Sequence, residues 1–182
     1  MRWILLPLLA LLCAASLAAQ TLNGEQVREV TWDELMPADY NLTFEDLYGT
    51  SADNLDALED VDPQAQSMLD HMQQVLASAP VVETLDGSMI RIPGFVVPLS
   101  GEDQRIDRFF LVPYFGACIH APPPPSNQII DTHFEPGTRI ENLYDAVWVT
   151  GRLTVETWRH ELGTSGYRLE AFQIEPYEEP QQ

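Results

Sequence analysis

The sequence predicts an α+β protein, in which an N-terminal helical region packs on a five-stranded, OB-like β-barrel. Two observations support this prediction. Apolar residues recur at helical spacing in the first half of the chain, and from Asp86-Gly87 onward they recur with a period of two. Five strand-like segments then follow at short intervals, with glycine or proline at their bends, and a small closed barrel needs such bends.

The first 18 residues have the pattern of a secretory signal peptide. Met1 and Arg2 form a short positive start, residues 3–12 are an apolar core, and Ser16-Leu17-Ala18 is a small-x-small cleavage site. The apolar run is too short to span a bilayer, which needs about 20 residues. We therefore expect a periplasmic or secreted protein that has no integral membrane segment after signal cleavage.

Residues 19–85 are predicted to form the helical region. Thr31 and Glu34 have the spacing of a capping box, which predicts a short helix through Leu35. The acidic residues 39–62 are interpreted as a solvated connector. Asp62-Pro63 is typical of a helix start. An amphipathic helix ending before Pro80 is expected from the apolar residues Ala65, Met68, Leu69, Met72, Val75 and Leu76.

Residues 86–177 are predicted to form the barrel domain, followed by a disordered tail at residues 178–182. Gly151 interrupts the clearest alternation and predicts a bend or bulge, and the apolar phase slips again near Ala171. The predicted strands are residues 89–99, 105–114, 127–134, 147–156 and 167–174.

The charge balance argues against a nucleic-acid partner. The chain has 28 acidic and nine basic residues, a formal net charge of −19, and all its basic residues are arginines. Binding to phosphates needs basic patches, which this composition does not favour. We interpret the acidity as a solvated surface, although such a surface also concentrates metal cations.

The most unusual chemistry lies in residues 109–128. This stretch holds Cys118, which is the one cysteine that remains after signal cleavage, and His120. Because no intrachain disulfide can form, the thiol must be buried, bound to a metal, reactive, or paired with another protein. The residues expected to form a rigid loop scaffold around it are Gly116, Pro122, Pro123, Pro124, Pro125, Asn127 and Gln128.

Cys118 and His120 are also candidate metal ligands. In an extended stretch, residues two apart project on the same face, and a thiolate with an imidazole suits zinc or copper(I). Two ligands make half a site, which His133, beside Asp131, or His160 could complete. A buried structural cysteine is the simpler interpretation, because unpaired cysteines are among the most buried residues.

Two further alternatives remain open at this motif. A Cys-dependent enzyme that uses Cys118 and His120 would need a third group to orient the imidazole, such as Asp131 or Glu135. The four prolines could stiffen the wall beside Cys118, or they could form a polyproline II rod that docks in an aromatic groove of a partner.

The chain also resembles a family of exported bacterial proteins catalogued as a domain of unknown function, number thirty-two ninety-nine. The central motif is G-A-C-I-H-x-P-P-P-P-x-N-Q. The resemblance implies an OB-type barrel, no assigned catalytic activity, and, for some members, genes near transporter components or zinc-responsive genes. It rests on residues 32–35, 98–99, 110–114, 116–120, 122–125, 127–128 and 147–153.

Together these observations predict a non-enzymatic accessory or binding protein of the bacterial cell envelope. Zinc or copper handling, or an association with transporter components, is the function that the motif and the resemblance favour. The alternatives are a small enzyme that uses Cys118 and His120, and a structural module that binds a protein partner through Pro122 to Pro125. Composition and motifs name neither the ligand nor the partner.

Overall fold

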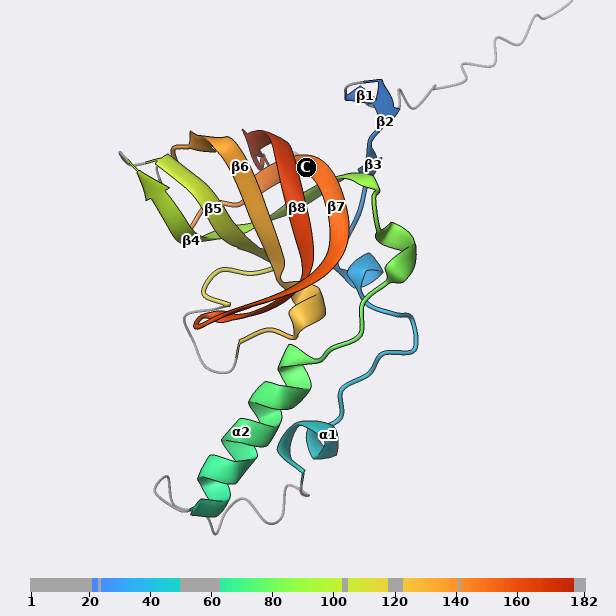
Figure 1. Ribbon diagram of the computed structural model, residues 1–182, viewed down its shortest axis with the longest axis vertical. Coiled ribbons are helices and arrows are strands. Elements are labelled where there is room, and N and C mark those ends of the chain that lie inside the picture. The colour runs from blue at the N-terminus through green and yellow to red at the C-terminus, as the bar shows by residue number, and fades with distance from the viewer. Residues whose placement is uncertain are drawn as a thin grey trace, which may run out of the picture.

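The computed structural model describes residues 21–22, 24–49, 63–102, 105–117, 123–140 and 142–178 (Figure 1). The predictions for the signal peptide, for most of the connector after residue 49, and for Cys118, His120 and Pro122 lie outside these residues. Within them, no helix is both long and apolar enough to cross a membrane.

Five long strands close into a barrel, as the sequence predicted. Around the barrel the order is β4-β5-β6-β8-β7, and β7 pairs back onto β4. Neighbouring strands are antiparallel except β6 and β8, which run parallel. This order and this single parallel pair are the Greek-key barrel of an OB-fold. The strands are β4 (Met89–Glu102), β5 (Arg105–Val112), β6 (Ile130–Thr138), β7 (Val147–His160) and β8 (Gly163–Pro176).

The main hydrophobic core fills the barrel. Because successive strand residues point to opposite faces, Phe109 and Leu111 of β5 point inward while Arg108 and Phe110 point outward. The inward residues of all five strands are fully or almost fully buried. The largest of them are Tyr167, Phe109, Ile90, Ile92, Leu111, Ile130, Leu153 and Leu169.

The N-terminal region contacts the barrel at several points. Trp32 donates a hydrogen bond from its indole N–H to the Pro93 carbonyl at 2.7 Å. Tyr167, inside the barrel, donates to the Leu35 carbonyl at 2.8 Å and accepts from the Val82 amide at 2.7 Å. The elements here are β1 (Thr21–Leu22), β2 (Glu25–Gln26), β3 (Arg28–Glu29), the 3₁₀ helices η1 (Trp32–Leu35) and η3 (Glu83–Leu85), α1 (Phe44–Tyr48) and α2 (Pro63–Ala77).

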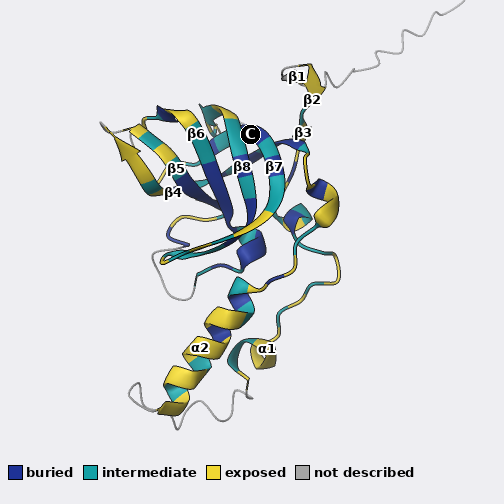
Figure 2. Cartoon of the chain, in the orientation of Figure 1, coloured by how far each residue is buried: buried dark blue, intermediate teal, exposed yellow. Residues whose placement is uncertain are grey.

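The amphipathic helix α2 forms over the predicted residues, but it projects away from the barrel and lies mainly beside α1 (Figures 1 and 2). Its C-terminal end contacts β8 of the barrel, where Leu76 is buried, as is Ala79 just beyond the helix. The helix α1 falls in the segment predicted as a connector. The sequence feature that marks the start of α1 is a capping box, in which Thr43 is bonded to Asp46 and aspartate takes the place of the usual glutamate.

The third strand differs from its predicted limits. Asn127 and Gln128, predicted to begin it, lie in a 3₁₀ helix, η4 (Ser126–Gln128), and the strand itself begins at Ile130. It then continues through Glu135-Pro136-Gly137, where it was predicted to end. Proline is tolerated there because Pro136 has no partner in the ladder with β5.

Gly151 lies at a β-bulge, as predicted. Thr150 pairs with Gln173 and Gly151 pairs with Ala171, so Phe172 is the extra residue on β8. A Cβ atom at Gly151 would lie 2.3 Å from the Glu170 carbonyl oxygen, so only glycine lets the two backbones approach this closely. This bulge lets the long β7–β8 hairpin bend around the barrel.

Candidate functional site on the outer face of the barrel

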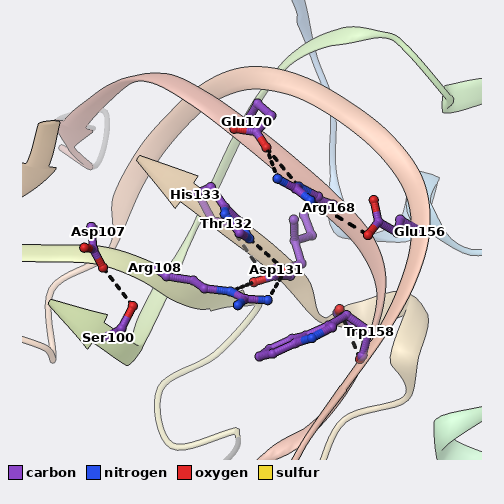
Figure 3. Close-up of polar contacts among 12 residues, drawn as sticks. Ser100, Asp107, Arg108, Asp131, Thr132, His133, Glu156, Trp158, Arg168 and Glu170 are labelled. Atoms are coloured by element: carbon purple, nitrogen blue, oxygen red, sulfur yellow. Dashed lines mark hydrogen bonds and ion pairs between the residues drawn. The ribbon is translucent and has the colours of Figure 1, made fainter. Parts of the chain in front are cut away.

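The outer face of β5, β6 and β8 gathers charged side chains from strands far apart in the sequence (Figure 3). The ladder pairs Arg108 with His133 and Phe110 with Asp131, so these side chains share one face. Beyond β6, the parallel ladder with β8 pairs Asp131 with Arg168 and His133 with Glu170. The closed barrel therefore converts three short sequence segments into one continuous polar surface.

Asp131 is the centre of this surface. Its side chain is 3% exposed, and its two oxygens accept a bidentate pair of hydrogen bonds from Arg108, each 2.9 Å long. The same carboxylate lies 3.0 Å from Nε2 of His133. A buried carboxylate with three such bonds is satisfied on both oxygens, and paired bonds of this kind are the strong, geometrically specific ones.

This arrangement determines the tautomer of His133. An ionised carboxylate can only accept hydrogen bonds, so Nε2 of a neutral His133 must carry the proton. The other ring nitrogen, Nδ1, then keeps its lone pair. A histidine that donates one N–H to a carboxylate and presents its other nitrogen is the usual geometry of a metal-ligating imidazole.

Trp158 of β7 covers the other side of Arg108. The guanidinium carbon of Arg108 lies 3.6 Å from the centroid of the Trp158 ring, a cation–π contact. Trp158 in turn stacks on His160 at 5.2 Å and meets Phe110 edge-on at 5.8 Å. The tip of the β7–β8 hairpin is thereby held against the outer face of β5.

A groove of about 460 Å³ lies beside Arg108 and His133. Arg168, on its far side, is hydrogen-bonded to Glu170 and lies 3.8 Å from Glu156. The Glu170 carboxylate raises the pKa of Arg168 above its usual value, with further contributions from nearby acids. The groove is lined by Ser100, Asp107, Arg108, His133, Phe134, Glu135, Arg168 and Glu170.

A second groove, of about 710 Å³, separates α2 from the hairpin tip. His160 and the prolines Pro123 and Pro124 line it. The Leu162 amide donates to Nδ1 of His160 at 3.2 Å, so Nε2 carries the proton of the neutral ring. A metal at Nε2 would require that proton to move to Nδ1, which would break the bond to Leu162.

The described part of the proline loop is tied to the N-terminal region. Asn127 donates to the Pro80 carbonyl at 2.8 Å, and Gln128 donates to the Trp32 carbonyl at 2.9 Å. Ser126 bonds to the Ala79 carbonyl at 3.2 Å, and Pro124 is buried. These contacts hold Pro123 and Pro124 in place as part of the wall of the second groove.

Among the described residues, no group of three or more His, Cys, Asp or Glu side chains is arranged to hold a metal ion. The predicted ligands Cys118 and His120 lie outside those residues, so their role stays a prediction. His133 and His160, the two candidates to complete a site, line different grooves. Arg108 and its ion pair with Asp131 were not predicted, because they depend on the pairing of β5 with β6.

The fold and this surface define a small OB-like barrel with a charged groove across its second, third and fifth strands. The family model for "Protein of unknown function (DUF3299)" matches residues 32–176, and the chain belongs to this family. The chain is similar to the crystal structure of a DUF3299 family protein from Pseudomonas aeruginosa PAO1. The two are 39% identical with a TM-score of 0.67, over 86% of this chain and 100% of that one. No curated protein matches the chain.

Proposed function

We propose that this protein is a non-enzymatic, exported binding protein of the bacterial cell envelope, and that zinc or copper(I) is its ligand. The observation that supports a metal best is the orientation of His133 by buried Asp131. In the neutral ring that bond leaves Nδ1 unprotonated, and the side chain lines the charged groove. Export to the periplasm or cell surface rests on the signal-like residues 1–18.

Cys118 and His120 are proposed as further ligands of such an ion. Thiolate and imidazole together favour zinc or copper(I) over magnesium and calcium, which prefer oxygen ligands. The negative net charge of the chain, −19, would raise the local concentration of any cation. His160 is the weaker candidate, because its unprotonated nitrogen, Nδ1, already accepts a hydrogen bond from the Leu162 amide.

The location of the groove favours a binding role. OB-folds commonly use the outer face of their second and third strands, with the adjoining loops, to bind ligands. Here those strands are β5 and β6, and the adjoining β7–β8 hairpin supplies Trp158. This is an argument from fold, which by itself assigns no chemistry.

Calorimetric titration of the chelator-treated mature protein with zinc, and with copper(I) under reducing conditions, tests the proposal. We expect about one ion per chain, with affinity that falls as the pH drops and the ligands protonate. His133→Ala and Cys118→Ser should each weaken binding at least tenfold, while His71→Ala, at an exposed position of α2, should leave it unchanged.

Failure to bind either metal, with no rise in melting temperature at concentrations well above micromolar, would refute the metal ligand. Binding that depends on Cys118 but is unaffected by His133→Ala would show that the metal does not bind at His133 on the outer face of the barrel.

A further inference from the structure

The structure also has an exposed aromatic patch where the middle of β4 meets the end of β5 and the start of β7. We define the aromatic patch as Phe95, Phe115 and Tyr144, with Tyr114 and Leu143 beside them in sequence. Phe115 and Tyr144 lie with their ring centroids 4.3 Å apart, and Phe95 meets Phe115 edge-on at 6.4 Å. Tyr144 is 68% exposed and Phe115 is 42% exposed.

Three segments that are distant in the sequence contribute to this patch, so it is a product of the fold and not of a single loop. Phe95 comes from β4, Phe115 from the turn that follows β5, and Tyr144 from the connection between β6 and β7. Folding brings the rings together without covering them. Contiguous exposed aromatic surface of this kind marks interaction sites, and Tyr and Phe are enriched in protein interfaces.

The charges in the connection that carries Tyr144 are mainly negative. Asp145 is exposed beside Tyr144, where its Oδ1 accepts a bond from Asn142 at 3.0 Å. The Tyr177 amide donates to the Ala146 carbonyl at 3.0 Å, which brings the exposed Glu178 near the end of that connection. Arg139 is the one basic residue in the connection from residue 139 to 146.

We propose that the aromatic patch docks a basic protein surface, whose arginine or lysine side chains insert among the rings beside Asp145. Aromatic faces attract such cations, and the protein itself seats Arg108 on Trp158 and Arg91 on Trp148. A second copy of the chain and an anionic lipid surface are disfavoured occupants, because the chain carries a net charge of −19. The aromatic patch and the proposed metal site have no residue in common.

Site-specific crosslinking in the native cell tests the proposal. The probe is photoreactive p-benzoylphenylalanine in place of Tyr144, and the matched control carries it in place of Phe172, which is 46% exposed on β8. We expect one protein adduct from position 144 that is absent from position 172. Mass spectrometry should place the crosslink next to arginine or lysine residues on the partner.

Charge reversal then tests the recognition itself. Asp145→Arg, in the same photoreactive background, should lower the yield of that adduct at least fivefold, while the melting temperature stays within about 2 °C. A crosslink to a second copy, to lipid, or to a surface without basic residues would overturn the proposal. So would equal yields from positions 144 and 172, no adduct at all, or a yield that Asp145→Arg leaves unchanged.

Discussion

Tyr167 and Asp131 occupy opposite sides of the same parallel pair of strands, β6 and β8. Tyr167 is fully buried inside the barrel, and its hydroxyl bonds only to backbone groups of Leu35 and Val82. Asp131 is equally buried on the outside, but its partners are the charged or ionisable side chains of Arg108 and His133, which border a groove.

The Tyr167 hydroxyl therefore has a structural role, whereas the Asp131 carboxylate also positions side chains at the candidate site. The Tyr167 hydroxyl joins the N-terminal region to the barrel through neutral bonds that no ligand can reach. Asp131 instead orients Arg108 and His133, whose side chains are 29% and 25% exposed to solvent. A buried ion pair is weak evidence for stability alone, which supports a positioning role for Asp131.

The largest effect should come from disrupting the pairing of β7 with β8, on which both faces of the barrel depend. Gly151→Val should destabilise the protein by at least about 3 kcal/mol, because the new side chain would collide with the Glu170 backbone and separate β7 from β8. Urea unfolding would measure this, with Thr154→Val on the same strand as a control that should stay within about 0.5 kcal/mol. A Gly151→Val protein with native stability would contradict the bulge and the close strand approach.

On the outer face, Asp131→Asn should cost about 2 to 3 kcal/mol of unfolding free energy, since Arg108 and His133 lose their shared carboxylate. The estimate is below that for a fully buried charge, because Arg108 is 29% exposed and can turn toward water. Asp107→Asn, an exposed carboxylate bonded to Ser100, is the matched control and should cost under about 0.5 kcal/mol. Equal losses of unfolding free energy in the two variants would show that Asp131 is not the central residue of the site.

On the inner face, Tyr167→Phe should cost about 1 to 2 kcal/mol through the loss of two hydrogen bonds. Burial raises the pKa of Tyr167 above its usual value, so the contribution of its hydroxyl is fully present at neutral pH. That contribution is lost as the pH rises above about 10, the pKa of an unfolded tyrosine. Denaturant curves from pH 8 to 11 should therefore show a smaller alkaline loss in Tyr167→Phe than in the natural protein, and identical losses would contradict this account.

The smallest expected effect is at the hairpin tip. His160→Phe keeps the stack on Trp158, and water can replace the lost bond to the Leu162 amide at the hairpin tip, so stability should change by less than about 0.5 kcal/mol. His133→Phe should cost about 1 kcal/mol, because Asp131 loses a donor. Thermal melts of the two variants compare the two histidines directly, and a larger loss of stability in His160→Phe than in His133→Phe would contradict their assigned roles.

Much of the barrel could be predicted from local pattern. Alternation identified all five strands, and Gly151 with the phase slip near Ala171 predicted the bulge that the ladder has there. The start of β6 was predicted too early, at Asn127 instead of Ile130, because the side chain of Asn127 bonds to the Pro80 carbonyl and its backbone lies in a 3₁₀ helix. Tertiary anchoring replaced strand pairing at that point.

The outer site could be predicted only in part. The sequence suggested His133 as a possible ligand and placed Asp131 beside it in the predicted third strand. It could not show the bidentate bond from Arg108, 23 residues away, because that contact depends on the register between β5 and β6. Cys118 and His120 remain predictions that rest on their motif.

The most direct test of the central claim is the nitrogen NMR spectrum of the histidine rings, recorded at pH 8 before and after one equivalent of zinc. We predict that His133 is the Nε2–H tautomer without metal, and that zinc shifts its Nδ1 resonance while His71 stays unchanged. A His133 ring that carries its proton on Nδ1, or one whose nitrogens do not respond to zinc, would contradict the claim that Asp131 prepares His133 to bind a ligand.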